Sequence, residues 1–422
     1  MSRTKNIFSM LFYGVKLKMI NLLALLINLA ILAYTAYDTY KSPESLWDNE
    51  LITIIIFFLL NVIWQTVSTL AEIISYVRPS GHWIENRKNI KQFLIDSEVE
   101  KTYVRPDDLP KDMPVIIDNS VNAILLSDTP IQIRPLKTHS KKVWNYIFQN
   151  KGILHLFLKS KWDTLRKGAF FNERKLCQAS EIIQSGACAY VRVSKGCYYN
   201  SFLTNDIYTA VLSDQEGTRI HPPLNASTYP IKKLDDSVFS NHMGVTTLAV
   251  SSDNYVMILR HNNKTAISAN KLAGSGSGSV DFTDWHQSTD TDLREIIIRT
   301  AHRELYEEAG FKELEKQGIK IESKVIGMFR NLERGGKPDY CLVTFIDADH
   351  FVLQDAFKAE KKEVVNNSQF VPIATPDGHY DLTKLAELLH DKQNSDSISL
   401  YMNFYFLERY FAQGTSRKGL MQ

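Results

Sequence analysis

Three glutamates stand close together in the second half of the chain, at a spacing that suits a metal-bound phosphate. Glu304, Glu307 and Glu308 fall at positions i, i+3 and i+4, so on a helix they would share one face. Carboxylates brought together in this way repel one another unless a cation lies among them. Oxygen ligands of this kind suit Mg²⁺ or Mn²⁺, with waters and substrate phosphates completing the coordination. The sequence therefore predicts a metal site at these three glutamates.

The residues around the glutamates follow a longer pattern. Glu295 is followed by seven residues and then by Arg303-Glu304-Leu305-Tyr306-Glu307-Glu308-Ala309-Gly310-Phe311. This stretch resembles the Nudix box, whose pattern opens with a glycine before that first glutamate. Thr289 stands at the position of this glycine. The resemblance covers roughly residues 241–422 and implies the mixed α/β/α sandwich of the Nudix fold there.

If the site is catalytic, a bound metal would polarise a pyrophosphate while a carboxylate activates water. Glu304 and Glu308 are the candidate bases, and Arg303 is the third candidate catalytic residue. The alternative is a surface helix whose glutamates form a solvated face.

A helix from Leu293 to Ala309 should carry these side chains, because the segment lacks Gly and Pro and is rich in helix formers. Asp290 or Asp292 can cap its start, and Gly310 suits a left-handed helix end. We expect an ion pair between Arg303 and Glu295, about two turns away.

Strands and loops on either side of the helix supply candidate nucleotide contacts. A hairpin is predicted over 246–259, followed by a Gly/Ser loop at 273–279. Beyond the helix, strands are predicted at 324–329 and 340–346. The candidate contacts from the loop are the backbone amides at Gly274, Gly276 and Gly278. The candidate contacts from the connection between the strands 324–329 and 340–346 are the cations Arg330, Arg334 and Lys337. A flexible loop and a solvated hairpin tip are the respective alternatives.

Two long uncharged stretches stand near the N-terminus, Met19 to Tyr37 and Leu51 to Ala71. Each is long enough to cross a hydrocarbon core of about 30 Å as a helix. We therefore predict transmembrane helices at 19–37 and 51–77, with a cytoplasmic segment 1–18 and an external loop 38–50. A cleaved signal peptide or a buried hairpin is the alternative.

Basic residues before the first stretch and after the second predict the orientation. Residues 1–18 hold four Lys and Arg and no acid, whereas the connection 38–50 holds one Lys and four acids. The positive-inside rule then places both termini in the cytoplasm of a multi-pass inner-membrane protein.

Polar side chains recur along one face of the second stretch, at Asn61, Gln65, Ser68 and Glu72. Such groups need polar partners in lipid. Two interpretations stay open: a contact inside the hairpin, for example with Asn28, or an oligomeric contact or pore lining between subunits.

Residues 83–239 carry no recognisable motif and are interpreted as an α/β region of unknown type. Short strands are predicted at 114–117, 123–126 and 187–193, and helices at 143–158 and 176–184. The aromatic-rich segment 398–412 is predicted to be a helix. The predicted fold is thus a transmembrane hairpin, an α+β cytoplasmic region and a Nudix α/β/α sandwich.

Composition narrows the possible partners. A net charge of +2 over 422 residues argues against a DNA- or RNA-binding surface. The four cysteines show no Cys-x-x-Cys pairing, so structural zinc and disulfides are not expected.

The order of the parts resembles the two-transmembrane Nudix effectors associated with cyclic-nucleotide synthases in bacterial antiphage systems (CBASS). That resemblance implies a cyclic oligonucleotide or other nucleotide ligand, a homo-oligomer in the lipid bilayer, and membrane damage that kills the infected cell. One alternative is a membrane-tethered, Mg²⁺-dependent pyrophosphatase acting on a nucleoside diphosphate derivative. Another is an adaptor with a relic fold.

Overall fold

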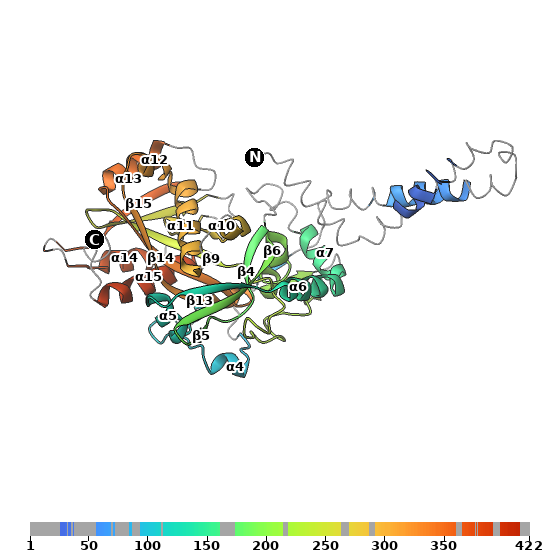
Figure 1. Ribbon diagram of the computed structural model, residues 1–422, viewed down its shortest axis with the longest axis horizontal. Coiled ribbons are helices and arrows are strands. Elements are labelled where there is room, and N and C mark those ends of the chain that lie inside the picture. Colours follow the sequence, from blue (N-terminus) through green and yellow to red (C-terminus); the bar gives the residue numbers. More distant parts are fainter. Residues whose placement is uncertain are drawn as a thin grey trace.

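The computed structural model describes most of the chain after residue 92 and short parts before it. The described residues are 26–31, 33–34, 37, 56–68, 71, 84–86, 93–110, 113–160, 174–213, 218–262, 270–286, 292–359, 365–375, 377, 379–390 and 397–413. Within them the protein is α+β (Figure 1).

The largest sheet of the described residues is mixed. Its strand order is β11-β10-β9-β14-β13-β2, and β12 pairs with β9 while β15 pairs with β10. Only the β14–β9 pair is parallel. The bounds are β2 Val115–Ile116, β9 Gly244–Val250, β10 Tyr255–His261, β11 Leu272–Ala273, β12 Gly276–Ser279, β13 Ile321–Asn331, β14 Lys337–Ile346 and β15 Val365–Pro372.

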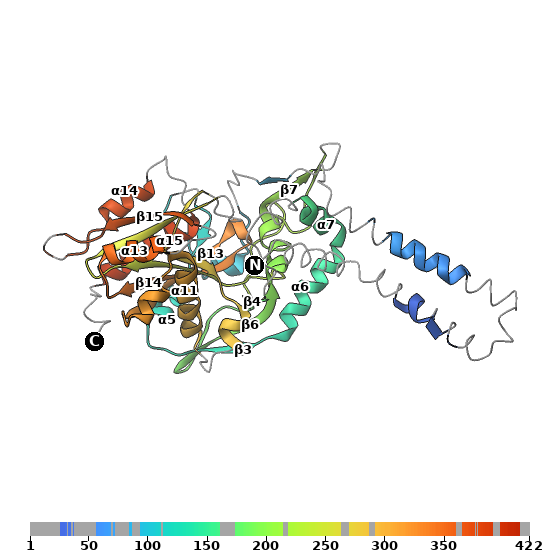
Figure 2. The same cartoon turned by 90° about the horizontal axis from the view of Figure 1, so that it is seen from above.

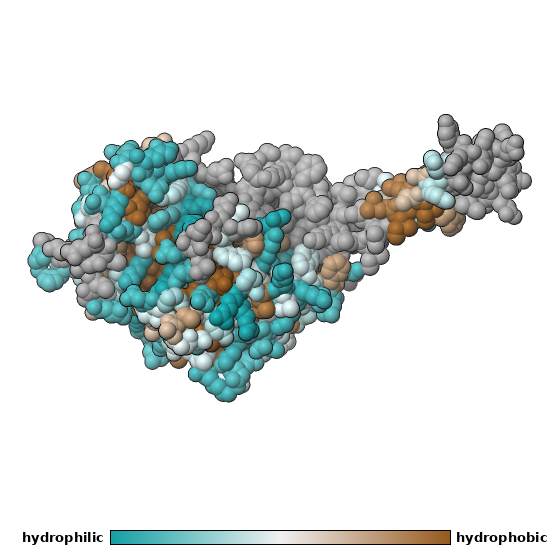
Figure 3. Space-filling model, in the orientation of Figure 1, coloured by the Kyte–Doolittle hydropathy of each residue, from teal (hydrophilic) through white to brown (hydrophobic). Residues whose placement is uncertain are grey.

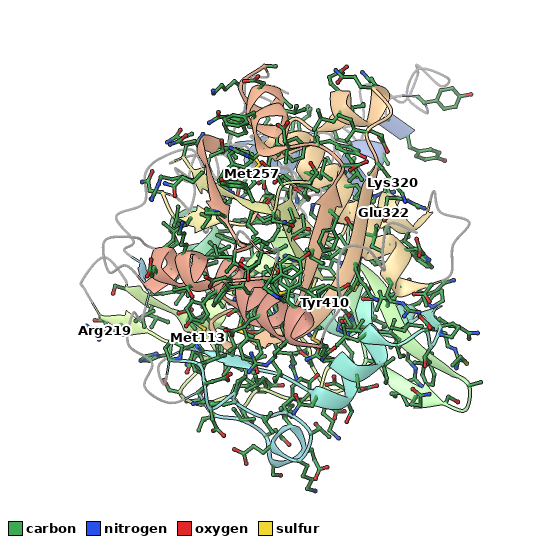
Figure 4. All side chains as sticks on the ribbon, turned by 90° about the vertical axis from the view of Figure 1, so that its left-hand side faces the viewer. Met113, Arg219, Met257, Lys320, Glu322 and Tyr410 are labelled. Atoms are coloured by element: carbon green, nitrogen blue, oxygen red, sulfur yellow. The ribbon has the colours of Figure 1, made fainter. Side chains whose placement is uncertain are left out.

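Helices cover both faces of this sheet. Successive residues of a strand point to opposite faces, and β9 shows this directly. Leu248 packs in a cluster with α15 (Ile398–Ala412), whereas Ala249 packs in one with α11 (Leu293–Ala309). Met257 of β10, labelled in Figure 4, lies in the α11 cluster.

Two smaller sheets come mainly from the middle of the chain. One has the order β1-β7-β8, and the other has β3-β6-β4 with β5 on β6. The helix α6 packs against β6 (Figure 2). Their bounds are β1 Ile84–Asn86, β3 Ile131–Pro135, β4 Arg174–Gln178, β5 Ile183–Ser185, β6 Cys188–Cys197, β7 Ala210–Ser213 and β8 Arg219–Ile220.

The remaining described helices after residue 92 are short. They are α4 Ser97–Glu100, α5 Asn119–Leu126, α6 Lys137–Gln149, α7 Lys151–Ser160, α9 Tyr198–Phe202, α10 Phe282–His286, α12 Lys312–Lys316, α13 His350–Ala359 and α14 Thr383–His390, with 3-10 turns η2 Asp206–Thr209 and η3 Leu332–Arg334.

The region 83–239 shares its core with the C-terminal part. β2 extends the large sheet by pairing with β13. One buried cluster joins Val121 and Leu176 to Ile296 of α11 and Leu342 of β14. The two parts of the chain therefore fold against each other.

Several sequence predictions of local structure are confirmed. α11 spans Leu293–Ala309, with Asp292 as its N-cap and Gly310 at φ 79° after its end. The hairpin of β9 and β10 and the helix α15 also lie where they were expected.

Two predicted elements were wrong. The run 123–126 lies in the helix α5, because the Asp118 side chain accepts from Ser120 N–H and Val121 N–H and starts a helix there. The predicted helix 176–184 falls on β4 and β5, because these segments pair with β6. Tertiary pairing overrides local preference for such short segments.

The predicted membrane-spanning hairpin is also corrected. Nowhere in the described residues is there a helix with both the length and the apolar composition that a bilayer crossing requires. The fold class with a transmembrane hairpin, and the multi-pass inner-membrane location with both termini in the cytoplasm, are therefore not supported. Of the predicted spans, residues 26–31, 33–34, 37, 56–68 and 71 are described. The rest of them, the loop 38–50 and Glu72 lie outside the described residues.

The described helical segments 26–31 and 56–68 contact each other through polar side chains. Asn28 Nδ2 donates to Gln65 Oε1 at 3.2 Å, so these two polar side chains pair within one chain. Asn61 is partly buried and Ser68 is exposed. Apolar side chains are exposed on these segments (Figure 3), with Trp64 at 72%.

Candidate functional site

The helix α11 turns two of the three predicted metal ligands inward. Ile297 and Leu305 are fully buried against the sheet, and on the adjoining face the side chains of Glu304 and Glu308 are only 11% and 8% exposed. The Glu307 side chain, in contrast, is 63% exposed. The i, i+4 pair thus lies under neighbouring elements, and the middle glutamate lies at the rim.

The glycines of the Gly/Ser segment allow β12 to lie directly against α11. A Cβ on Gly276 would come within 2.8 Å of Leu305 N, and a Cβ on Gly278 within 2.1 Å of Glu304 Oε1. Between them, Ser277 N–H donates to Glu308 Oε2 at 2.8 Å. These residues were predicted to approach phosphate. The structure places them against the two buried carboxylates.

Gly274 lies earlier in the same segment, before β12, and is buried. A Cβ there would meet Thr246 Cγ2 at 2.6 Å and Thr247 O at 2.8 Å. Its lack of a side chain therefore serves close packing on β9.

Arg303 is the cation that contacts Glu304 directly, and Lys175 forms a short ion pair with Asp281 nearby. Its Nη1 donates to Glu304 Oε1 at 2.8 Å, and its Nη2 donates to Ser279 O at 3.0 Å and to Asp284 Oδ2 at 3.2 Å. Asp281 Oδ2 lies 3.6 Å from Nη2. These partners take the place of the predicted one, Glu295, whose side chain is exposed.

Acidic groups outnumber cations around the buried pair. Burial raises the pKa of Glu304 to about 8, Arg303 opposes this rise, and the charges of Glu308 and Glu307 add to it. A carboxyl whose pKa is raised in this way is poorly stabilised in its ionised form. An additional cation would therefore stabilise the ionised pair.

Three site residues escaped sequence reasoning. Asp281 and Asp284 precede the glutamate helix in a segment where no motif distinguishes them from ordinary loop acids. His261 ends β10, and its Nε2 lies 3.5 Å from Glu308 Oε1. Because His261 and Glu308 are far apart in the sequence, their contact could not be predicted without the arrangement of the sheet and α11.

Of the cations predicted to contact a nucleotide, Arg330 and Lys337 are buried and Arg334 is partly buried, and all three pair with acids. Arg330 lies 3.7 Å from Glu181, and Arg334 Nε donates to Asp206 Oδ1 at 2.7 Å. Lys337 forms a short ion pair with Asp339. Glu181 and Asp206 belong to the middle region, so two of these three cations link that region to the β13–β14 connection.

The donor set can be tested against the predicted Mg²⁺ or Mn²⁺. Among the described residues, no group of three or more His, Cys, Asp or Glu side chains is arranged to hold a metal ion. Mg²⁺ does not need such a group, because it is commonly bound by one or two carboxylates together with waters and substrate phosphates. Glu304 and Glu308 supply two carboxylates of this type, whereas the Glu307 side chain is exposed at the rim.

Comparison with known proteins does not assign a family. No protein-family model matches the chain, and no curated protein matches it. Among solved structures, the crystal structure of DR0079 from Deinococcus radiodurans is similar at 12% sequence identity and a TM-score of 0.26. The match covers 47% of this chain and 96% of that chain. Likeness at this level carries no inference about fold or function.

The resemblance to a Nudix domain fused to two transmembrane helices, and to the CBASS effectors of that architecture, is thereby corrected. No family match supports it, and the described part of the chain lacks a helix able to cross a bilayer. What stands is the local geometry of the glutamate helix.

Proposed function

We propose that the buried face of α11 binds a divalent cation together with a pyrophosphate-bearing nucleotide, and hydrolyses its phosphoanhydride bond. The observation that carries this proposal is the pair of buried carboxylates, Glu304 and Glu308, which stand one helical turn apart on α11 and both contact β12. Placing two such groups together out of water is costly unless a cation or a proton compensates them. The substrate class that fits is a nucleoside diphosphate derivative.

Each residue has a distinct role in this proposal. Glu308 is the fixed oxygen ligand for Mg²⁺ or Mn²⁺, and Glu304, one helical turn away, is the second carboxylate beside the metal. Arg303 keeps the Glu304 carboxylate in place through its hydrogen bond at 2.8 Å. The metal, when bound, supplies charge stabilisation at the phosphate oxygens.

A general base must take a proton from the attacking water. Glu304 suits this role, because burial raises its pKa to about 8 in the absence of a metal, and the charge of a bound cation would lower it toward neutrality, where a base is most effective. Glu308 is held by Ser277 N–H and suits the role of a fixed metal ligand. Glu304 is thus the candidate base and Glu308 the candidate metal ligand, one turn apart on the same helix.

The test uses the full chain with Mg²⁺ or Mn²⁺ and a panel of nucleoside diphosphate derivatives. Calorimetry measures metal binding and chromatography measures product release. Glu308→Gln removes a direct oxygen ligand and should weaken metal binding markedly, and Glu304→Gln should abolish turnover while leaving the protein folded. The matched control is Glu313→Gln on α12, an exposed carboxylate beyond the site, which should behave as wild type.

Two outcomes would count against the proposal in different ways. Failure to bind metal, with and without a nucleoside diphosphate, would contradict the proposed metal site. Tight nucleotide binding without product release would favour a nucleotide sensor, the other role expected from the sequence. A cyclic oligonucleotide has phosphodiester rather than phosphoanhydride bonds, so it belongs in the panel as a ligand that should bind uncleaved in that case.

A further inference from the structure

The carboxylate of Glu308 is approached by nitrogen atoms at both of its oxygens. Ser277 N–H donates to Oε2 at 2.8 Å. His261 Nε2, from the end of β10, lies 3.5 Å from Oε1. The His261 and Glu308 side chains are only 6% and 8% exposed. Two elements, β12 and β10, therefore enclose one carboxylate of α11.

The histidine lacks a formed hydrogen bond in this arrangement. Neither His261 Nδ1 nor Nε2 has a hydrogen-bond partner within the described residues, although both atoms are buried. A buried polar atom left without a partner costs about 1–3 kcal/mol. At 3.5 Å the Nε2 to Oε1 separation is slightly longer than a formed N–H···O bond, so a small side-chain movement is enough to make it.

We propose that His261 is a positioning residue for Glu308, and that its Nε2–H donates to Oε1 in the metal-bound protein. This inference rests on the proposed metal site. An ionised carboxylate has about four lone-pair positions. Ser277 approaches Oε2 with its N–H and, at 3.5 Å, with its hydroxyl, and His261 would donate to Oε1. These donors at both oxygens limit rotation of the carboxylate and leave lone-pair positions for a cation.

Contacts of this kind have a measurable effect. Hydrogen bonds to a ligating side chain hold it in the orientation that the metal requires, and removing one commonly weakens metal affinity by about 10- to 100-fold. For His261 the effect should be on metal affinity rather than on folding, because the ring makes no other formed polar contact within the described residues that its loss would break.

The experiment measures the affinity of the full chain for Mn²⁺ alone, by electron paramagnetic resonance of the free ion. His261→Leu removes the donor and should weaken binding by about 10- to 100-fold. His261→Gln keeps an N–H at a similar reach and should restore most of the affinity. His302→Leu is the matched control: His302 lies on α11 and contacts Ser323 Oγ at 2.9 Å, so its loss should leave Mn²⁺ affinity unchanged.

The possible results separate this inference from the proposed function. Wild type that binds Mn²⁺ and His261→Leu that binds equally well would overturn the positioning role and leave the metal site standing. Equal weakening in His261→Leu and His261→Gln would also overturn it, since packing rather than the N–H would then matter. A wild-type protein that binds no Mn²⁺ would contradict both the metal site and the positioning role of His261. Melting temperatures of the metal-free variants within a few degrees of wild type would show that the comparison is between folded proteins.

Discussion

The carboxylate of Glu304 occupies the space that a side chain at Gly278 would fill. A Cβ on Gly278 would lie 2.1 Å from Glu304 Oε1 and 2.5 Å from Oε2. The strand β12 can therefore lie over the glutamate helix only because residue 278 has no side chain. The glycine in the Gly/Ser segment and the position of the buried Glu304 carboxylate therefore depend on each other.

This relationship predicts different effects for two glycine substitutions. Gly278→Ala should displace the Glu304 carboxylate and reduce Mn²⁺ affinity by about tenfold or more, because the clash is with a side chain that can move. Gly276→Ala should instead destabilise the fold by about 1–3 kcal/mol, because its Cβ would meet the backbone of Leu305. Calorimetric Mn²⁺ titration and urea unfolding measure the two effects.

The control for both is Gly152→Ala in α7, where an added Cβ meets nothing within 4 Å. It should be neutral or stabilise the protein by about 0.5–1 kcal/mol. Equal behaviour of all three variants would contradict the packing argument.

Arg303 should be needed for stability as well as for the site. Arg303→Ala leaves Glu304 and Asp284 without their shared cation, and breaking a buried pair of this kind costs about 3–5 kcal/mol. Arg303→Lys keeps the charge but loses the fork of donors, so we expect an intermediate loss. Urea unfolding at constant pH tests this order. A lysine variant as stable as wild type would show that charge alone is sufficient.

The buried His139 should make the free energy of unfolding depend on pH. Burial lowers the pKa of this histidine to about 4, and the Lys142 charge adds to the effect. In the unfolded chain the pKa is about 6.5, so the unfolded state binds a proton first as pH falls. The free energy of unfolding should therefore decrease as pH falls from about 6.5 to 4, by up to about 1.4 kcal/mol per pH unit from this group. Unfolding curves over this range should show a shallower slope for His139→Gln, and an unchanged slope would exclude His139 as the cause.

Arg330 should stabilise the junction between the middle region and the large sheet. The side chain is 1% exposed, and it donates to Lys232 O at 2.7 Å and to Gly336 O at 2.9 Å. Arg330→Ala should cost about 3–5 kcal/mol, because Glu181 would lose its cation inside the fold. Lys101→Ala, at an exposed ion pair with Glu98, should change stability by less than about 1 kcal/mol. A similar small loss in Arg330→Ala would favour the alternative that this cation is available for a ligand.

Local sequence signals determined the helix that carries the site. Asp292, the unbroken run of helix formers and Gly310 act within a few residues of one another, so the bounds of α11 follow without knowledge of the rest of the chain. The spacing of Glu304, Glu307 and Glu308 follows for the same reason, and so does the helix 398–412.

Tertiary structure decided which of these glutamates is buried and what surrounds it. Helical periodicity places Glu304, Glu307 and Glu308 on one face, but only the position of β12 buries the first and last and leaves Glu307 exposed. His261 reaches Glu308 through the register of the β-sheet, and Arg330 reaches Glu181 through the packing of the middle region. These contacts join residues far apart in sequence. They depend on the relative placement of whole elements, which short-range spacing and capping do not encode.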